Sequence, residues 1–121
     1  MSAPDYSGYG LSSMPDHKSF AYTFESDAKI VDQRIEKLDV NKYSLYLMDY
    51  GAPVGYRLAL LHPERVQGLI VQNGNAYDEG LLAFWDLIKK HWKDGLPESR
   101  AAIRNYASDR KNPTIWQQYN L

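Results

Sequence analysis

One carboxylate in this sequence lies where it could act as a nucleophile. Asp49 follows an uncharged, β-rich run at residues 43–48 and precedes Gly51, after which the spacing of apolar residues becomes helical. An aspartate carboxylate is ionised at pH 7, so it can attack an electrophilic carbon without a neighbouring base. A charge at such a strand-to-helix turn can also be a helix N-cap with no catalytic role. The pattern therefore predicts a nucleophile at Asp49 and leaves the N-cap as the alternative interpretation.

The segments on either side of Asp49 must position it. Residues 43–48 and 66–72 are short apolar runs typical of buried strands, and residues 51–61 are predicted to form a helix between them. Pro53 lies in the first turn of that helix, where its missing N–H costs little. Two parallel strands joined by a helix form a right-handed βαβ unit. The sequence therefore predicts an α/β fold with Asp49 at the first strand-to-helix turn.

Helices are predicted before and after this βαβ unit. Thr23 can cap the first helix, whose apolar stripe consists of Phe24, Ala28, Val31, Ile35 and Leu38. After a turn near residue 75, a second stripe of helical spacing consists of Leu81, Trp85, Ile88 and Trp92. We therefore expect two domains: residues 1–75 with the βαβ core, and residues 76–121 with helices only.

The composition excludes several classes of function. The 14 Lys and Arg side chains against 15 Asp and Glu leave a net charge of −1, which gives no electrostatic basis for binding nucleic acid or an anionic membrane. No apolar run approaches the roughly 18 residues that a membrane span needs. The N-terminus also lacks the basic start and apolar stretch of a signal peptide. We therefore expect a cytoplasmic protein whose partner is a small-molecule substrate.

Metals and cofactors are not expected. The chain has no cysteine, and its three histidines, His17, His62 and His91, show no metal-ligand spacing. Each histidine is predicted to be a solvated side chain rather than a catalytic base. Gly8 and Gly10 do not form a dinucleotide fingerprint, because no strand precedes them and the third glycine is absent.

Three segments together carry a family resemblance. Residues 3–12, 49–55 and 62–66 read Ala-Pro-Asp-Tyr-Ser-Gly-Tyr-Gly-Leu-Ser, Asp-Tyr-Gly-Ala-Pro-Val-Gly and His-Pro-Glu-Arg-Val. In order and spacing they resemble the loop after the fourth strand, the nucleophile elbow and the turn before the sixth strand of α/β-hydrolases. The elbow looks like the branch with an Asp nucleophile, which contains epoxide hydrolases and haloalkane dehalogenases. The resemblance implies a partial α/β-hydrolase fold over essentially the whole chain.

The resemblance also implies a reaction and roles for particular residues. Asp49 would attack an epoxide or halogenated carbon to form an alkyl-enzyme ester, and the backbone N–H of Tyr50 would contribute to the oxyanion hole. Residues 76–121 would be the start of the helical cap that such enzymes insert. Tyr77 and Trp85 are then candidate substrate-binding residues, with ordinary packing as the alternative for each.

Three positions depart from the family pattern. Leu47 stands where the elbow usually has a small residue, and Ser7 stands where many relatives have proline. Tyr50 stands where dehalogenases usually have a tryptophan that holds the halide. The branched Leu47 therefore disfavours a serine-type esterase, and Tyr50 leaves the elbow without the tryptophan that holds the halide.

Parts of the family pattern do not occur in this chain. They are the oxyanion loop after the third strand, the acid after the seventh strand and the histidine after the eighth. We therefore expect the central fragment of a longer hydrolase, inactive alone. A non-catalytic remnant or protein-interaction module is the alternative. Because two strands leave open sheet edges, we expect homo-oligomers or association through those edges.

Overall fold

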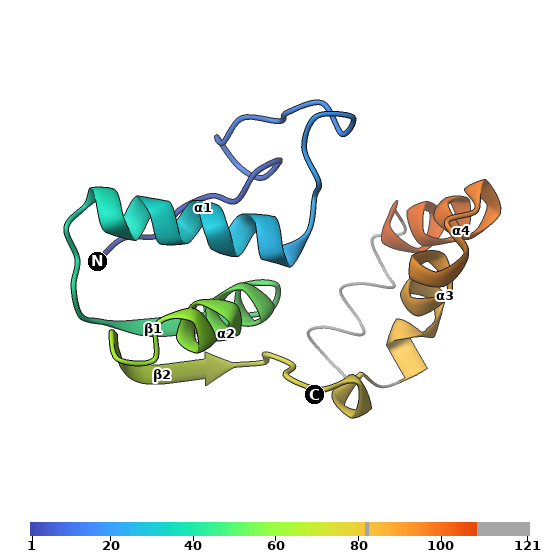
Figure 1. Cartoon of the computed structure of the whole chain (residues 1–121). Coiled ribbons are helices and arrows are strands. Elements are labelled where there is room, and N and C mark those ends of the chain that lie inside the picture. The colour runs from blue at the N-terminus through green and yellow to red at the C-terminus, as the bar shows by residue number, and fades with distance from the viewer. Residues whose placement is uncertain (82, 109–121) are drawn as a thin grey trace. The chain divides into compact units, whose positions relative to one another are not determined.

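The computed structural model describes residues 1–81 and 83–108, which form two compact units. The first unit, Met1–Ala76, contains α1 (Phe24–Lys37), β1 (Tyr43–Met48), α2 (Gly51–Leu61) and β2 (Val66–Gln72) (Figure 1). The second unit begins at Tyr77 and contains short 3-10 turns at Asp78–Gly80 and Ala83–Trp85, followed by α3 (Asp86–Asp94) and α4 (Pro97–Ser108). The predicted strands at 43–48 and 66–72 and the predicted helix at 51–61 are confirmed.

The sheet of the first unit consists of β1 and β2, paired in parallel. Leu45 lies opposite Leu69 and Leu47 opposite Val71, with a register irregularity between Tyr43 and Ser44. Because side chains alternate along a strand, Leu45 and Leu47 face the helices. Leu47 is almost fully buried there, with 4% of its surface exposed. This strand–helix–strand order is the βαβ core that the sequence predicts.

The first unit is built on one face of this sheet. Helices α1 and α2 lie on the same side of the two strands (Figure 1). Their contact buries Ala28, Val54 and Leu58, and the side chains packed around this cluster are Tyr6, Phe24, Val31, Ile35 and Leu45. The opposite face carries exposed apolar side chains, with Tyr46 and Ile70 each 61% exposed and Met48 also exposed. Among the described residues the helices therefore cover β1 on one face, whereas Leu69 and Val71 of β2 on that face are each 44% exposed and the opposite face is uncovered.

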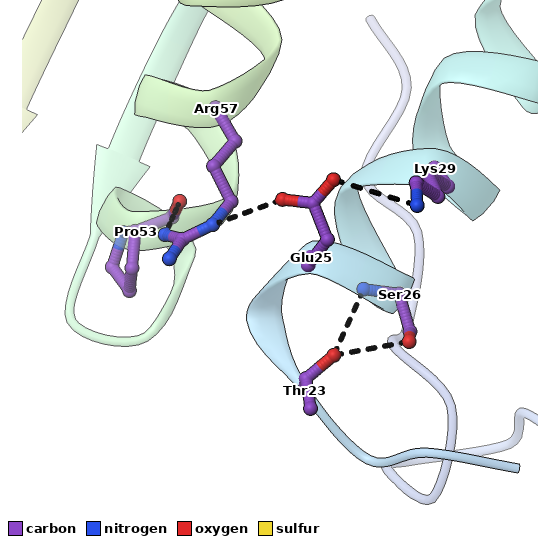
Figure 2. Close-up of polar contacts among 6 residues, drawn as sticks. All are labelled: Thr23, Glu25, Ser26, Lys29, Pro53 and Arg57. Carbon is purple, nitrogen blue, oxygen red and sulfur yellow. Dashed lines mark hydrogen bonds and ion pairs between the residues drawn. The ribbon is translucent and has the colours of Figure 1, made fainter.

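The start of α1 is fixed by a cap and by a link to α2. The Ser26 N–H donates to the Thr23 Oγ1 at 3.1 Å, as the sequence predicts for a threonine N-cap (Figure 2). Glu25 pairs with the Arg57 Nε at 3.5 Å, and Arg57 also donates to the Pro53 carbonyl at 2.8 Å (Figure 2). The Arg57 guanidinium therefore connects the first turns of both helices.

The second unit is held by contacts between α3 and α4. Ser99 is buried, and its hydroxyl donates to the Asp94 Oδ1 at 2.7 Å and lies 2.9 Å from the His91 Nδ1. The hydrogen bond from the Leu96 backbone N–H has the largest effect in lowering the pKa of the Asp94 carboxyl, and the bond from the Ser99 hydroxyl has the next largest. Gly95 ends α3 in the left-handed conformation, with φ of 60°. These bonds set the turn between the two helices.

Candidate active site

Asp49 lies between the end of β1 and the start of α2, in a left-handed backbone conformation with φ of 49°. This conformation is costly for most L-residues, and Asp and Asn tolerate it best. Asp39 and Asn73 adopt it as well, with φ of 53° and 48°. The left-handed turn alone therefore does not distinguish a nucleophile from an ordinary loop aspartate.

The two carboxylate oxygens of Asp49 have different surroundings. The backbone N–H of Tyr50 donates to Oδ1 at 2.7 Å. Among the described residues no hydrogen bond or ion pair uses Oδ2, and the side chain is exposed. The residue assigned as the N-cap is Tyr50, whose side chain makes no capping bond, whereas Asp49 accepts the Tyr50 N–H through Oδ1 and the Ala52 N–H through its carbonyl. A structural, cap-like role of Asp49 therefore stays the alternative to the nucleophile. One oxygen is restrained and the other faces outward.

Tyr50 contributes its ring as well as its amide to this turn. The ring lies 5.5 Å from that of Phe24, at an interplanar angle of 54°. Burial, followed by the nearby Tyr9 and Asp49, raises the pKa of the Tyr50 phenol. The Tyr50 side chain therefore packs on α1 and lies close to Asp49.

Gly55 and Leu47 form the packing beneath the turn. A Cβ at Gly55 would overlap the Leu47 Cδ2 and lie 2.7 Å from Cδ1 and 2.9 Å from Cγ. Leu47 occupies the position where the family pattern has a small residue, and the side chain that Gly55 lacks leaves room for it. The absence of a side chain at Gly55 in α2 therefore compensates for the larger side chain at position 47.

The opening loop is folded by its own polar groups. Asp5 accepts the Leu11 N–H through Oδ2 at 2.9 Å, and the Ser12 hydroxyl donates to the Asp5 carbonyl at 2.7 Å. Gly8 and Gly10 have φ of 82° and 52°, and a Cβ at Gly10 would overlap the Asp5 carboxyl. The Asp-x-x-Gly-x-Gly-x-Ser spacing therefore has a structural reason in this chain.

The histidines differ from one another. His17 is solvated as predicted, with 82% of its side chain exposed. For His62 that prediction is wrong, because its side chain is 29% exposed and its Nε2 lies 3.2 Å from the Asp32 Oδ2. His62 follows the last residue of α2, whereas Asp49 precedes the first. An 11-residue helix is about 16 Å long, so His62 is not positioned to serve Asp49 as a base.

Arg65 completes the contacts at this end of the sheet. Its guanidinium donates to the Val40 carbonyl at 2.8 Å, lies 3.9 Å from the Asp32 Oδ1 and covers the Tyr43 ring at 5.8 Å. Arg65 thereby links the turn between α2 and β2 to α1, to Val40 and to the first residue of β1. The His-Pro-Glu-Arg turn is a structural feature at the end of the fold away from Asp49.

Arg65→Lys is expected to lower the free energy of unfolding by about 1 kcal/mol. Lysine lacks the planar guanidinium, which contacts Val40, Asp32 and Tyr43 at the same time. Urea unfolding followed by circular dichroism would measure the change. Arg57→Lys is the comparison variant: Arg57 also bonds a carbonyl, that of Pro53, and lies over a ring, that of Phe24, but its side chain is 41% exposed, so a smaller loss is expected. An equal loss in both variants would contradict this role of Arg65.

Asp27 is a residue whose burial the sequence interpretation missed. It lies in the first turn of α1, is 9% exposed, and its Oδ1 has no hydrogen-bond partner among the described residues. The pKa of this carboxyl is raised, because the effect of burial is larger than the opposite effect of a hydrogen bond from the Ser7 backbone. Its spacing could have revealed this, because Asp27 lies three residues after Phe24 and four before Val31, on the apolar stripe.

Asp27→Asn is expected to stabilise the chain at pH 7 by about 1 kcal/mol, because it removes a buried charge. A raised pKa means that the folded state binds the proton more tightly than the unfolded state does. The contribution of Asp27 to the free energy of unfolding is therefore greatest below the pKa of the unfolded state. It is lost as the pH rises through the pKa of the folded state. Unfolding free energies from pH 4 to 7 should show the advantage of the variant growing with pH. An advantage that shrinks with pH would contradict this sign.

The remaining predicted site residues lie in the second unit. Tyr77 is exposed at its start, and Trp85 contacts Trp92 with ring centroids 6.1 Å apart. The role of Tyr77 and Trp85 in substrate binding stays a prediction, as does the assignment of this unit to a cap. Within residues 1–81 and 83–108, no group of three or more His, Asp or Glu side chains could hold a metal ion, and no helix is long and apolar enough to cross a membrane.

The amino-acid sequence is similar to a protein-family model and to several known proteins. A family model described as alpha/beta hydrolase fold matches residues 2–120. An uncharacterized hydrolase of Saccharomyces cerevisiae is 41% identical over 92 residues, covering 75% of this chain and 31% of the relative. Haloalkane dehalogenase 2 of Mycobacterium tuberculosis is 31% identical over 71 residues, covering 59% of this chain and 24% of the relative.

A haloalkane dehalogenase of Agrobacterium fabrum is 40% identical over 67 residues, covering 55% of this chain and 21% of the relative. The matched part of the chain thus spans less than a third of each of these three relatives. The family model, the parallel β1–α2–β2 core and the turn at Asp49 all agree on the fold. The chain belongs to the α/β-hydrolase fold family.

Proposed function

We propose that Asp49 is the nucleophile of a hydrolase that acts on an epoxide or a halogenated carbon. The observation that carries this proposal is the difference between the two oxygens of its carboxylate. Oδ1 accepts the Tyr50 N–H, whereas Oδ2 is exposed and has no hydrogen bond among the described residues. A restrained carboxylate with one outward oxygen suits attack on a carbon atom.

The first chemical step needs no base. The Asp49 Oδ2 forms a bond to the electrophilic carbon while the bond from that carbon to the leaving group breaks. A halide leaves as an anion, whereas an epoxide oxygen stays attached to the substrate as an alkoxide and takes a proton from water, which leaves hydroxide. The product is an ester of Asp49 in which Oδ1 is the carbonyl oxygen.

The second step explains the position of the Tyr50 amide. When water adds to the Cγ of the ester, negative charge collects on the carbonyl oxygen, which is Oδ1. The Tyr50 N–H already lies 2.7 Å from this atom, so it can stabilise the oxyanion without rearrangement. We propose that this step needs a base other than His62, which lies at the other end of α2 from Asp49.

The relatives support the class of electrophile. Two that are 31% and 40% identical are named haloalkane dehalogenases. Small alkyl halides and epoxides are therefore the first substrates to test.

The test is covalent capture. The purified chain is incubated separately with styrene oxide and with 1-bromobutane, and the intact mass is followed with time. We expect a single added group per chain on the peptide that contains Asp49, removable by hydroxylamine as expected for an ester. The adduct should persist, because its hydrolysis lacks a base. An unmodified chain, or modification confined to other residues, would refute the nucleophile.

A second candidate function is a protein-interaction module without catalysis. It is favoured by the uncovered face of the β1–β2 sheet, where Tyr46, Met48 and Ile70 are exposed, since an apolar patch of this kind is typical of an interaction site. Sedimentation velocity over a hundredfold range of concentration would test self-association. Ile70→Lys should shift the chain towards the monomer, and a native chain that stays monomeric throughout would remove this candidate.

A further inference from the structure

The turn between α3 and α4 contains a hydrogen-bonded set of polar side chains that the proposed reaction does not use. The Ser99 hydroxyl lies 2.9 Å from the His91 Nδ1, and it donates to the Asp94 Oδ1 at 2.7 Å and to the Leu96 carbonyl at 2.9 Å. Ser99 is buried, with 4% of its surface exposed, and His91 is half-buried. His91 is therefore held in place and is not the solvated side chain that the sequence predicts.

A count of protons fixes the direction of these bonds. A serine hydroxyl has one proton to donate. The Leu96 carbonyl can only accept, and so can the Asp94 carboxylate, whose pKa is lowered with the largest effect from the Leu96 N–H. The Ser99 proton is thus committed to these two oxygens, and no proton remains for the bond to His91. The His91 Nδ1 must therefore carry a proton and donate it to the Ser99 Oγ.

This tautomer leaves the second ring nitrogen of neutral His91 unprotonated. A neutral imidazole has one N–H and one lone pair, and the bond made by one nitrogen decides which nitrogen keeps the lone pair. Among the described residues the His91 Nε2 has no hydrogen-bond partner, and it is not closed off from solvent. The Asp94 carboxylate, acting through Ser99, also stabilises positive charge on the ring when Nε2 forms a bond. His91 thus combines an accessible lone pair with a ring of fixed orientation.

We propose that His91 is an acyl-transfer site of the second unit, at which Nε2 attacks the carbonyl carbon of an activated ester. The Nε2 lone pair forms a bond to that carbon while the bond from the carbon to the aryloxide breaks, and the aryloxide leaves as an anion. The ring becomes an acyl-imidazolium that keeps its Nδ1 proton. Water then adds to the acyl carbon, the bond to Nε2 breaks, and a carboxylic acid and one proton are released to solvent.

The substrate class follows from this second step. An acyl group can leave the imidazole on attack by water, whereas an alkyl group cannot. Esters are therefore the substrates with which this site can turn over, and epoxides and alkyl halides are not. The inference is independent of the proposed role of Asp49.

The three side chains have different roles in this reaction. His91 is the catalytic residue, because its Nε2 touches the acyl carbon. Ser99 and Asp94 are positioning residues that act through His91. Ser99 is not the nucleophile, because its side chain is buried and its proton is donated to an acid rather than to a histidine base.

The experiment measures the tautomer and the reactivity of His91 in the 121-residue chain. Long-range nitrogen-15 NMR is recorded at about pH 8, above the pKa of about 6.5 of a free imidazole. The rate at which diethyl pyrocarbonate acylates each histidine is followed by peptide mass mapping, and turnover by the hydrolysis of p-nitrophenyl acetate. His17→Gln is the matched control for His91→Gln, because the His17 side chain is 82% exposed.

We expect the NMR spectrum to show His91 protonated at Nδ1, and diethyl pyrocarbonate to acylate it about tenfold faster than His17, the scale of one hydrogen bond to a charged group. Exposure alone predicts the opposite order, because His17 is the more accessible side chain. His91→Gln should remove most of the ester hydrolysis above background, and His17→Gln should leave it unchanged. A His91 protonated at Nε2, or acylated no faster than His17, would overturn the proposal.

Asp94→Asn and Ser99→Ala test the two positioning roles. Asp94→Asn keeps the size of the side chain and removes its charge, so acylation of His91 should slow about tenfold. Ser99→Ala removes the acceptor of the Nδ1 proton, so part of the His91 population should become protonated at Nε2. An unchanged rate in Asp94→Asn together with an unchanged tautomer in Ser99→Ala would refute these roles. Where a variant does not fold, as judged by calorimetry, the tautomer and the rates of the native chain decide.

Discussion

Asp49→Asn is expected to abolish alkylation of the chain by epoxides and alkyl halides. The neutral amide of asparagine is a poor nucleophile, so the rate should fall by at least about 10³-fold, the scale seen when a catalytic nucleophile is removed. Asparagine tolerates the left-handed backbone of position 49 as well as aspartate does, so the turn should be retained. Intact mass after incubation with styrene oxide, with peptide mapping, measures the result.

Asp39→Asn provides a closely matched control for this experiment. Asp39 and Asp49 are both exposed aspartates with positive φ, at 53° and 49°. The substitution changes charge and chemistry equally at the two positions, but Asp39 follows α1 rather than β1. The Asp39 variant should form the Asp49 adduct at the native rate. Equal loss in both variants would mean that charge, not the nucleophile, controls the reaction.

Gly55→Ala is expected to lower the free energy of unfolding by about 1–3 kcal/mol, the cost of overpacking a tight contact. The added methyl group would overlap the Leu47 Cδ2 and approach Cγ to 2.9 Å. Leu47 is 4% exposed and has little room to retreat. Because Leu47 lies two residues before Asp49, the variant should also alkylate more slowly. Urea unfolding and the adduct assay measure the two effects.

Gly68→Ala separates the contact at Gly55 from the general effect of replacing glycine. Gly68 lies within β2, where its nearest neighbour for an added Cβ is the Ser44 Oγ at 3.7 Å, an ordinary distance. Alanine at an unstrained position restricts the unfolded chain, so this variant should be unchanged or more stable by about 0.4–1 kcal/mol. A loss at Gly68 as large as at Gly55 would refute the packing argument.

The features that the sequence predicted are those with short-range causes. The run at residues 43–48, the glycine at 51 and Pro53 in the first turn specify a strand, a bend and a helix within ten positions. Thr23 likewise caps α1 through Ser26, three residues away. Local conformational preferences and periodicity carry this information, so the βαβ core and the location of Asp49 could be obtained without coordinates.

The features that the sequence did not predict depend on contacts between distant segments. His62 was expected to be solvated, but Asp32, 30 residues earlier, reaches it from α1. The burial of Asp27 in the first turn of α1 was not predicted either. Which charged residues become buried is decided by how α1 packs on its neighbours, and a helical pattern does not specify this. The restraint of Oδ1 by the Tyr50 amide likewise required coordinates.

The packing of Leu47 against Gly55 has a consequence for the order in which the chain folds. These two residues are eight positions apart, and the strand pairs such as Leu45 and Leu69 are 24 apart. The contact between Leu47 and Gly55 closes a short loop and can form early, whereas parallel strand pairing over 24 residues forms slowly. The bend that carries Asp49 should therefore form before β1 and β2 pair.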